Sequence, residues 1–315
     1  MKIVNCPVCD SKEYTEIFIV HDQDPRDVGL KDYFRLVKCK GCNMHLLNPQ
    51  PTKEELIPYY GSTYYGEDVS SWNFLKKIIK KERNIKPLNE KKGKLLDYGC
   101  GDGLFLELAK EKGWEVTGVE QSMEGAKRTS KRLGINVLNE EEFSKSEEQY
   151  DLITLWHVLE HVHEIDALLS KLKSLLKQDG KLFIAIPNIK CLQFKYFKKK
   201  TFHLDIPRHI WHFSPNTIKQ LLQKHGYKAT SINHYSFEYG AFSFTQGLYN
   251  TLTTVEHNYF YNKIKRNYVQ SVSNNKNKII TYLLFPVFVP VGIIGSFIES
   301  SLKKGASIQV TAQKQ

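Results

Sequence analysis

The run Leu95-Leu96-Asp97-Tyr98-Gly99-Cys100-Gly101-Asp102-Gly103-Leu104-Phe105 joins a short apolar strand, a turn with three glycines and the first residues of a helix. Glycine lets a backbone take positive φ and approach a ligand closely. A helix start presents backbone N–H groups that have no partner within the helix. Glu120 ends the next predicted strand, where a carboxylate can accept hydrogen bonds from the hydroxyls of a ribose. A glycine turn in this strand–turn–helix setting, followed by an acid, predicts a nucleotide-binding site.

Strands and helices alternate along the chain from Lys94 onwards. Strands separated by helices of about 10–15 residues are typical of a parallel sheet with crossover helices. We therefore expect an α/β fold with a doubly wound, mostly parallel, Rossmann-like sheet. The expected strands are residues 95–98, 115–120, 136–138, 150–156, 181–187, 229–235 and 306–311, and the expected helices are residues 104–112, 122–133, 165–176 and 215–226.

The spacing of Gly99, Gly101 and Gly103 after Asp97 differs from the Gly-x-Gly-x-x-Gly pattern of dehydrogenases. It resembles the class I S-adenosylmethionine-dependent methyltransferases, clearly over residues 94–186 and more loosely over 226–311. The resemblance implies that Asp97 organises the loop near the amino-acid moiety of the cofactor and that Glu120 binds its ribose. The residues assigned to the cofactor in this way are Asp97, Gly99, Cys100, Gly101, Gly103, Glu120, Gln121, Asn139, Trp156 and Tyr60.

Two cysteine pairs precede this core, Cys6-Pro-Val-Cys9 and Cys39-Lys-Gly-Cys42. Four thiolates in two such knuckles suit a tetrahedral zinc ion, and four protein ligands leave no open position for catalysis. We expect a structural zinc, with ribbon strands between the pairs. A zinc ribbon ahead of this core resembles a subgroup of bacterial methyltransferases, including some that act on nucleotide-linked deoxysugars. Zinc ribbons also occur in nucleic-acid-binding proteins.

A second possible metal-binding motif occurs in the sequence, but the secondary structure expected around it does not fit metal binding. His157-x-x-Glu160-His161 fits the inverted zinc-protease pattern, which needs both histidines on one continuous helix. His157 directly follows a predicted strand, so the helix is not expected there. We assign His157 to substrate or cofactor positioning. For Glu160 and His161, packing of the turn is an equally good explanation.

The motif Asp205-Ile-Pro-Arg208-His209-Ile-Trp-His212-Phe-Ser-Pro follows the fifth strand and resembles a motif of the same broad methyltransferase group. A hydroxyl acceptor needs a base, and histidine titrates in the right range. The predicted catalytic residues are His209, then His212, then His157. Arg208 is predicted to hold a substrate phosphate or carboxylate. Tyr64 and Tyr65 are predicted substrate contacts. Packing of the loop is the alternative for the histidines.

Charge and hydropathy single out the last 130 residues. Residues 186–315 hold 17 Lys or Arg against 4 Asp or Glu, whereas residues 1–185 hold 28 against 30. Residues 279–298 carry no charge, which meets the length of a membrane span. Pro286, Pro290 and the expected return of the chain to the sheet argue against a straight span and favour an in-plane or re-entrant hairpin. Contact with an anionic membrane and packing on the protein or in a dimer remain equal alternatives.

The expected organisation has five parts: a zinc-ribbon module (1–50), a helical Tyr-rich lid or linker (51–93), a methyltransferase core (94–235), a basic and apolar helical insertion (236–305) and a closing strand (306–315). Residues 1–10 lack a signal-peptide pattern, so we expect a cytoplasmic protein that can be peripheral to the inner face of the membrane. The predicted function is methyl transfer to a small polar acceptor such as a sugar, glycan or lipid-linked intermediate. The alternatives are a nucleic-acid methyltransferase and a non-catalytic, membrane-tethered scaffold that binds the cofactor.

Overall fold

The structure is a computed structural model of the 315-residue chain, and it describes residues 1–21, 33–60, 86–89, 92–255, 257–264 and 275–315. The chain forms two compact units, each built from several segments. The first consists of Met1–Thr63, Pro187–Thr217 and Asn233–Ile308. The second consists of Tyr64–Ile186, Ile218–Ile232 and Gln309–Gln315.

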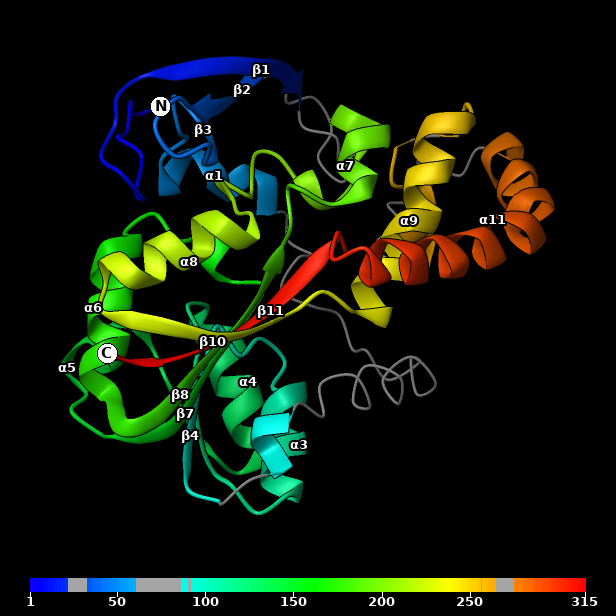
Figure 1. The fold of residues 1–315 in the computed structure, drawn as a ribbon. Coiled ribbons are helices and arrows are strands. Elements are labelled where there is room, and N and C mark those ends of the chain that lie inside the picture. Colours follow the sequence, from blue (N-terminus) through cyan, green and yellow to red (C-terminus); the bar gives the residue numbers. More distant parts are fainter. Residues whose placement is uncertain (22–32, 61–85, 90–91, 256, 265–274) are drawn as a thin grey trace. The chain divides into compact units, whose positions relative to one another are not determined.

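The second unit is built on a seven-stranded sheet with the order β10-β11-β8-β7-β4-β5-β6, and Figure 1 shows its strands running side by side. The pairs β6–β5, β5–β4, β4–β7 and β7–β8 are parallel. This confirms the expected α/β fold with a mostly parallel, doubly wound sheet. The strands are β4 (Lys94–Tyr98), β5 (Glu115–Val119), β6 (Asn136–Leu138), β7 (Tyr150–Trp156), β8 (Leu176–Pro187), β10 (Tyr227–Asn233) and β11 (Ser307–Lys314).

Strand β4 lies at the point where the sheet changes direction of growth. Along the chain, β5 and β6 are added on one side of β4, while β7 and β8 are added on the other. In open α/β sheets, ligands bind in the crevice at the carboxyl ends of the two strands that flank this point, which here are β4 and β7. The glycine turn that follows Tyr98 therefore stands where the topology places a ligand site.

Helices cover both faces of this sheet. Figure 1 shows α3 and α4 on one face and α6 on the other. Between the sheet and α3 lies an apolar cluster that includes Leu95, Phe105, Leu152 and Phe183. Burial of such side chains is the main force that holds the layers together. The helices of this part of the chain are η2 (Lys86–Asn89), α3 (Leu104–Glu111), α4 (Met123–Leu133), α5 (Glu140–Lys145), η3 (Leu159–His161), α6 (Ile165–Leu175) and α8 (Pro215–Lys224).

The first unit contains a four-stranded antiparallel sheet of order β1-β2-β3-β9. Strands β1 (Tyr14–His21) and β2 (Tyr33–Cys39) lie between the cysteine pairs, as expected for a ribbon, and β3 (His45–Leu47) follows the second pair. The fourth strand is β9 (Trp211–His212), which comes from the histidine motif and pairs with β3. The ribbon is thus completed by residues far along the chain.

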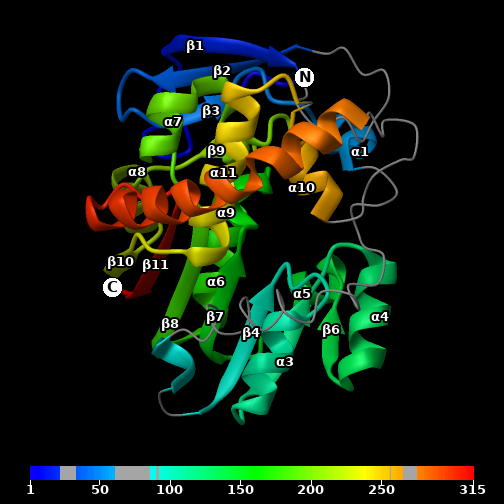
Figure 2. The ribbon, with the colours of Figure 1, turned by 90° about the vertical axis from the view of Figure 1, so that its right-hand side faces the viewer.

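The rest of the first unit is helical. Helix α9 (Phe237–Leu252) lies between α7 (Leu192–Phe197) with η4 (Lys198–Lys200) and α11 (Asn275–Ser301), and Figure 2 shows α9 and α11 against each other. An aromatic and apolar cluster that includes Phe197, Tyr249 and Phe288 fills the contact. The other helices of the unit are α1 (Lys53–Tyr60), η5 (Phe202–Leu204) and α10 (Tyr259–Ile264).

The apolar segment 279–298 differs from the hairpin that its prolines suggest. It forms one continuous helix, α11, with Pro286 and Pro290 inside it. A proline in a helix removes one backbone hydrogen bond and bends the helix, but packing against a neighbour can hold the helix together. Here the Tyr249 hydroxyl of α9 donates to the Thr281 carbonyl of α11 at 2.8 Å. The prediction of a hairpin within residues 279–298 is therefore wrong, and α11 instead packs as one helix against α9.

Candidate functional site

The glycine turn is held by the strands around it. The backbone N–H groups of Gly99 and Cys100 both donate to the carbonyl of Val119, at 2.8 and 2.9 Å. Asp97 is buried at the end of β4, and its Oδ1 accepts a 2.6 Å hydrogen bond from the Thr154 hydroxyl of β7. The acid that the resemblance assigns to loop organisation is therefore fixed between the two central strands.

The three glycines of the turn all have positive φ, which L side chains rarely adopt. A Cβ at Gly99 would meet the Val158 side chain at 2.5 Å, and one at Gly103 would meet the Thr129 side chain at 2.6 Å. Gly101 differs, because a Cβ there would meet nothing within 4 Å. The turn is packed at both ends and open in its middle, so its backbone can be approached by a ligand at Gly101.

The carboxylate of Glu120 is buried against this turn. Its Oε2 accepts from the Gly101 N–H at 3.0 Å, and its Oε1 accepts from the Ser122 N–H at 2.9 Å. Each carboxylate oxygen has two lone pairs, so both oxygens keep the capacity to accept from hydroxyl groups. An open glycine turn with an oriented acid fits a cofactor that carries a ribose, as predicted for Asp97, Gly99, Cys100, Gly101, Gly103 and Glu120.

The predicted adenine contacts have different surroundings. Gln121 is exposed after β5. Asn139 caps α5, with its Oδ1 accepting from the Glu142 N–H at 2.9 Å. The Trp156 ring packs between Phe105 and Phe183, with ring centroids 5.2 and 4.9 Å away. These roles remain predictions, and the geometry assigns Asn139 and Trp156 at least a structural part.

His157 stands directly after β7 with a φ of 54°, and its Nδ1 lies 3.4 Å from Oε1 of the buried Glu160. Residues Leu159–His161 form a three-residue 3-10 helix. His157 is outside that helix, so His157 and His161 are not presented by one continuous helix as the protease pattern requires. The structure therefore agrees with rejecting the inverted zinc-protease interpretation.

The four cysteines of the N-terminal module converge on one point. Their Sγ atoms all lie within 4.8 Å of one another, with 3.4 Å between Cys6 and Cys42 and 3.5 Å between Cys9 and Cys39. Zinc–sulfur bonds of about 2.3 Å in a tetrahedron place sulfur atoms about 3.8 Å apart, so this donor set fits zinc. The same cluster would close all four coordination positions, which agrees with a structural role.

The two knuckles share a feature that sequence reasoning missed. Asp10 and Asn43 each follow the second cysteine of a pair, and both have positive φ. The Asp10 N–H donates to the Cys6 carbonyl at 2.9 Å, and the Asn43 N–H donates to the Cys39 carbonyl at 3.0 Å. Asn and Asp tolerate this left-handed conformation better than most residues. Asp10 and Asn43 after a Cys-x-x-Cys pair were therefore a readable signal.

Arg208 is buried and its guanidinium is engaged within the first unit. Its Nε and Nη2 donate to Asp205 Oδ1 at 3.0 and 2.6 Å, and its Nη1 donates to the Tyr59 carbonyl at 2.8 Å. The geometry therefore makes Arg208 a brace between the histidine motif and helix α1. Its predicted contact with a substrate anion stays a prediction, and these bonds do not favour it.

The two predicted bases lie close together in the first unit, with ring centroids 6.4 Å apart. His209 Nδ1 pairs with the His203 carbonyl at 3.0 Å, and His209 Nε2 lies 3.7 Å from Asp205 Oδ2. The carbonyl fixes the Nδ1–H tautomer, which leaves Nε2 as the basic nitrogen. Burial, with the nearby His209 and His45, lowers the pKa of His212 well below its usual range.

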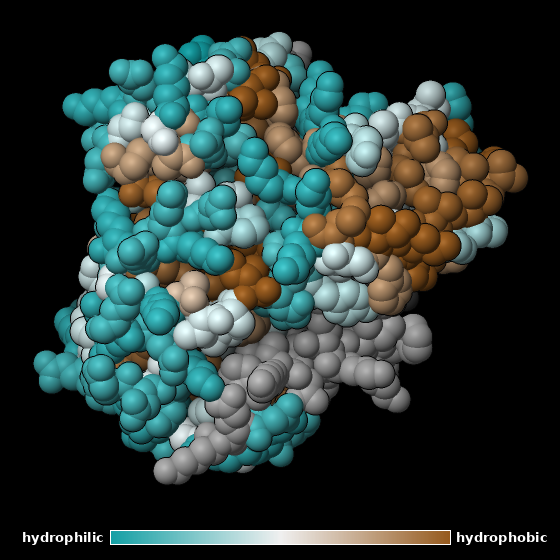
Figure 3. Space-filling view, viewed as in Figure 1, coloured by the Kyte–Doolittle hydropathy of each residue, from teal (hydrophilic) through white to brown (hydrophobic). Residues whose placement is uncertain are grey.

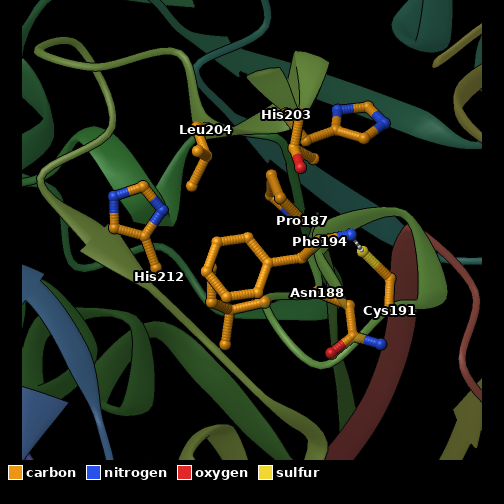
Figure 4. Close-up of a pocket in the computed structure, with 9 residues that line it drawn as sticks. Pro187, Asn188, Cys191, Phe194, His203, Leu204 and His212 are labelled. Atoms are coloured by element: carbon orange, nitrogen blue, oxygen red, sulfur yellow. Dashed lines mark hydrogen bonds between the residues drawn. The ribbon is translucent and has the colours of Figure 1, made fainter. Parts of the chain in front are cut away.

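A small pocket adjoins His212 in the same unit (Figure 4). The imidazole of His212 hydrogen-bonds the backbone of His209, and its Nε2 has no hydrogen-bond partner among the described residues. His212 therefore contributes a buried imidazole, whose Nε2 lacks a partner among the described residues, to the lining of this pocket. It is lined by Pro187, Asn188, Ile189, Cys191, Phe194, Thr201, His203, Leu204 and His212.

The tyrosine predictions are only partly visible. Tyr60 is half-buried at the end of α1 in the first unit. Tyr64 and Tyr65 lie outside the described residues. Sequence reasoning missed two threonines that contact the glycine turn or the strand before it. The Thr129 hydroxyl of α4 donates to the Gly101 carbonyl, and the Thr154 hydroxyl of β7 donates to Asp97. A threonine within the apolar run Leu152–Trp156 of β7 was the available signal for Thr154.

Several solved structures and curated proteins to which the chain is similar are described as methyltransferases. A chain described as a SAM-dependent methyltransferase from Archaeoglobus fulgidus aligns with 76% of this chain and 94% of its own, at 20% identity and a TM-score of 0.48. "Ubiquinone biosynthesis O-methyltransferase" of Pelagibacter ubique (strain HTCC1062) is 34% identical over 126 residues, which are 36% of this chain and 51% of that protein. The protein of the same name from Salmonella paratyphi A (strain ATCC 9150 / SARB42) is 34% identical over 103 residues, 30% of this chain and 43% of that protein. The chain spans about half the length of these curated relatives.

A sequence profile described as "Methyltransferase domain" matches residues 71–232. The match covers just over half of the chain and includes the glycine turn, Glu120 and strands β4 to β8. It therefore coincides with the sheet and with the open turn that fit the cofactor. Together these observations confirm what residues 95–120 predict: the chain belongs to the family of S-adenosylmethionine-dependent methyltransferases that carry this domain.

Proposed function

We propose that the protein transfers a methyl group from S-adenosylmethionine to a hydroxyl oxygen of a small polar acceptor. The observation that carries the proposal is the turn at Gly101, open in its middle and faced by the oriented carboxylate of Glu120. When bound, the cofactor would supply a methyl group on a sulfonium, whose thioether is the leaving group when an acceptor oxygen attacks the methyl carbon. Asp97, the glycines and Glu120 would hold it.

The acceptor side of the proposal rests on the histidine motif. His209 is our candidate base, because the His203 carbonyl fixes its tautomer and leaves Nε2 to accept the proton of a hydroxyl. His212 stays neutral because of its lowered pKa, so we assign it to hydrogen bonding of the acceptor through Nε2. His157, paired with Glu160, is the third candidate. Positioning alone contributes much of the rate in such displacements.

The choice of a small hydroxylated acceptor is supported by the names of the curated relatives, which are O-methyltransferases of ubiquinone biosynthesis. Within that class we favour a sugar, a glycan or a lipid-linked intermediate, handled in the cytoplasm by a protein peripheral to the membrane. The basic segment 186–315 supports an acceptor that carries phosphate or resides at an anionic surface. Nucleic acid is the rival acceptor, and a scaffold that only binds the cofactor is the rival to catalysis.

Calorimetric titration with S-adenosylmethionine and S-adenosylhomocysteine tests the cofactor site. Glu120→Gln should weaken binding by roughly tenfold to 100-fold, because a hydrogen bond to a charged group contributes about 1.5–3 kcal/mol. Glu124→Gln, an exposed neighbour at the start of α4, is the matched control and should leave affinity unchanged. Unaltered affinity of a well-folded Glu120→Gln protein would refute the assignment.

Formation of S-adenosylhomocysteine, measured with a phenol, a sugar nucleotide and an RNA oligomer as acceptors, then tests the reaction. We expect turnover with one of the small hydroxylated acceptors and a strong loss in His209→Gln with cofactor affinity retained. Turnover with RNA alone would overturn the acceptor class. Cofactor binding without turnover on any acceptor would favour the scaffold.

A further inference from the structure

Helix α11 buries its polar side and exposes its apolar side. Its buried residues follow one face of the helix, and only Phe288 among them is a large apolar residue. A helix on the surface of a water-soluble domain does the opposite and turns its apolar stripe inward. The buried residues are Asn277, Thr281, Phe288, Gly292, Ser296 and Glu299.

The outward side of α11 is a continuous apolar surface. Figure 3 shows it as a brown area over α9 and α11. Leu283 is 74% exposed and Ile294 is 58% exposed, and the surface covers roughly two thirds of the helix circumference at 3.6 residues per turn. We call it the α11 face. It consists of Ile279, Tyr282, Leu283, Phe285, Val287, Val291, Ile294, Phe297, Ile298 and Leu302.

The contact between α9 and α11 has the character of helix packing in lipid. A Cβ at Gly292 would meet the Thr245 hydroxyl of α9 at 2.0 Å, and a Cβ at Gly240 of α9 would meet the Ser296 hydroxyl at 2.2 Å. Small residues that bring backbones together, with hydroxyls bonding across the contact, are typical of helices in membranes. Beside the cluster around Phe288 the pair is joined through small and polar residues, while most of the large apolar residues of α11 are exposed.

Basic residues stand at both ends of the α11 face. Lys276 and Lys278 begin the helix and Lys303 and Lys304 follow it, and all four are exposed. The one acidic residue of α11, Glu299, is fully buried, so no carboxylate faces outward from this helix. An apolar surface flanked by lysines matches the interface of an anionic bilayer, where acyl chains lie beneath charged headgroups. A second copy of this face would bring like charges together.

The neighbouring segment favours an arrangement of α11 in the plane of the membrane interface over one that crosses the bilayer. The Leu192 N–H, at the start of α7, donates to the Lys304 carbonyl just beyond the end of α11. At the other end of the helix pair, Asn250 donates to the carbonyl of Lys200 in η4. The segment 192–200, with exposed Lys195, Lys198 and Lys199, is therefore tied to the helix pair at two points and packs against α9. A basic segment packed on α9 favours a position of the pair at the membrane surface, because charged side chains are costly in the bilayer core.

We propose that the α11 face is a docking surface for an anionic lipid bilayer, with α11 lying in the plane of the membrane interface. Apolar residues enter the boundary between headgroups and acyl chains, and the flanking lysines contact acidic headgroups. This surface goes beyond the proposed methyl transfer and does not depend on it. By length and composition α11 could also span a membrane. Only 22% of its most apolar 18-residue stretch is buried, and this low burial fits both a spanning and an in-plane arrangement.

Flotation with vesicles of phosphatidylcholine and with vesicles that add phosphatidylglycerol tests the proposal on the full chain. We expect binding to the anionic vesicles at low salt. Leu283→Glu with Ile294→Glu should reduce binding at least tenfold without lowering the melting temperature, because both side chains already face outward. Ile57→Glu, equally exposed on α1, is the matched control and should bind as the wild type does.

Replacement of the lysines that flank the α11 face tests the electrostatic part of the proposal independently. Each lysine near an anionic surface contributes roughly 1 kcal/mol, so Lys276→Ala with Lys278→Ala should weaken binding by about 25-fold and reduce its salt dependence. Absence of binding to anionic vesicles at low salt would overturn the proposal. So would a dimer in light scattering that Leu283→Glu dissociates, because the face would then be covered by a second copy.

Discussion

Glu299 is a buried carboxyl whose ionisation should affect the stability of the fold. Its Oε1 accepts from Gln193 Nε2 at 2.8 Å and from the Ala306 N–H at 3.1 Å, while Oε2 has no partner among the described residues. Burial raises the pKa of Glu299 to about 8, against an ordinary value of 4.5. The folded protein therefore holds this proton in a range where the unfolded chain has released it.

The sign of the effect follows from that difference. A carboxyl with a raised pKa stabilises the folded state fully below pH 4.5 and loses that contribution as the pH rises through about 8. We expect the free energy of unfolding in urea to fall between pH 5 and pH 9, by an amount on the order of a few kcal/mol. Glu299→Gln should flatten this slope, whereas the exposed Glu147→Gln should keep it. Equal slopes in both variants would contradict the prediction.

Single residues also mark what sequence alone could reveal about the site. Asp97, the three glycines and Glu120 were identifiable because their spacing along strand, turn and strand is short and regular. Thr154 reaches Asp97 only because β7 pairs with β4, a contact between residues 57 positions apart. The sequence predicts Arg208 as an anion ligand, yet its guanidinium donates to Asp205 and to the Tyr59 carbonyl. Whether an arginine contacts solvent or its own chain depends on its burial, which the local sequence does not specify.

At the scale of elements, the close packing of α9 and α11 predicts an unusual response to a glycine substitution. Replacing a helical glycine with alanine normally stabilises a helix by about 1 kcal/mol. At Gly292 the added Cβ would lie 2.0 Å from the Thr245 hydroxyl and 3.0 Å from the Ala241 carbonyl, and the latter is backbone. Gly292→Ala should therefore destabilise the protein by about 1–3 kcal/mol.

Thermal and urea unfolding measure this effect. Val291→Ala, next to Gly292 but on the outward side of α11, is the matched control and should change stability far less. A stabilised Gly292→Ala protein would show that the two helices are not pressed together at this point.

Elements differ in how well sequence predicts them. The parallel strands and crossover helices of the second unit were predictable because their hydrophobic periods and turn residues are local signals. Helix α11 was not, since Pro286 and Pro290 are local signs of interruption that packing against α9 overrides. Strand β9 is two residues long and forms by pairing with the edge of β3. Two residues are too few for a hydrophobic periodicity that would predict a strand.

At the scale of the whole molecule, the two units predict separate responses to loss of metal. Wild-type protein should contain about one zinc ion per chain, and Cys39→Ser should lose it. The melting temperature of the transition in which the first unit unfolds should fall by on the order of 10 °C. Cofactor affinity should change less than twofold, because Asp97, the glycine turn and Glu120 all belong to the second unit.

Atomic emission, calorimetric melting and titration with S-adenosylhomocysteine give the three readouts. Cys191→Ser, which alters a buried cysteine outside the cluster, is the control and should retain zinc. Full zinc content in Cys39→Ser, or loss of cofactor binding together with the metal, would contradict the separation.

The pairing of β3 with β9 has a consequence for how this architecture can be inherited. Residues 45 and 46 lie opposite residues 212 and 211, so the sheet that carries the cysteine knuckles also holds the end of the histidine motif in register. Recombination that exchanged residues 1–50 alone would deliver a ribbon without its fourth strand, and would leave His212 without the strand that positions it. The N-terminal module and residues 187–217 therefore form one heritable unit, and a working chimaera has to carry both.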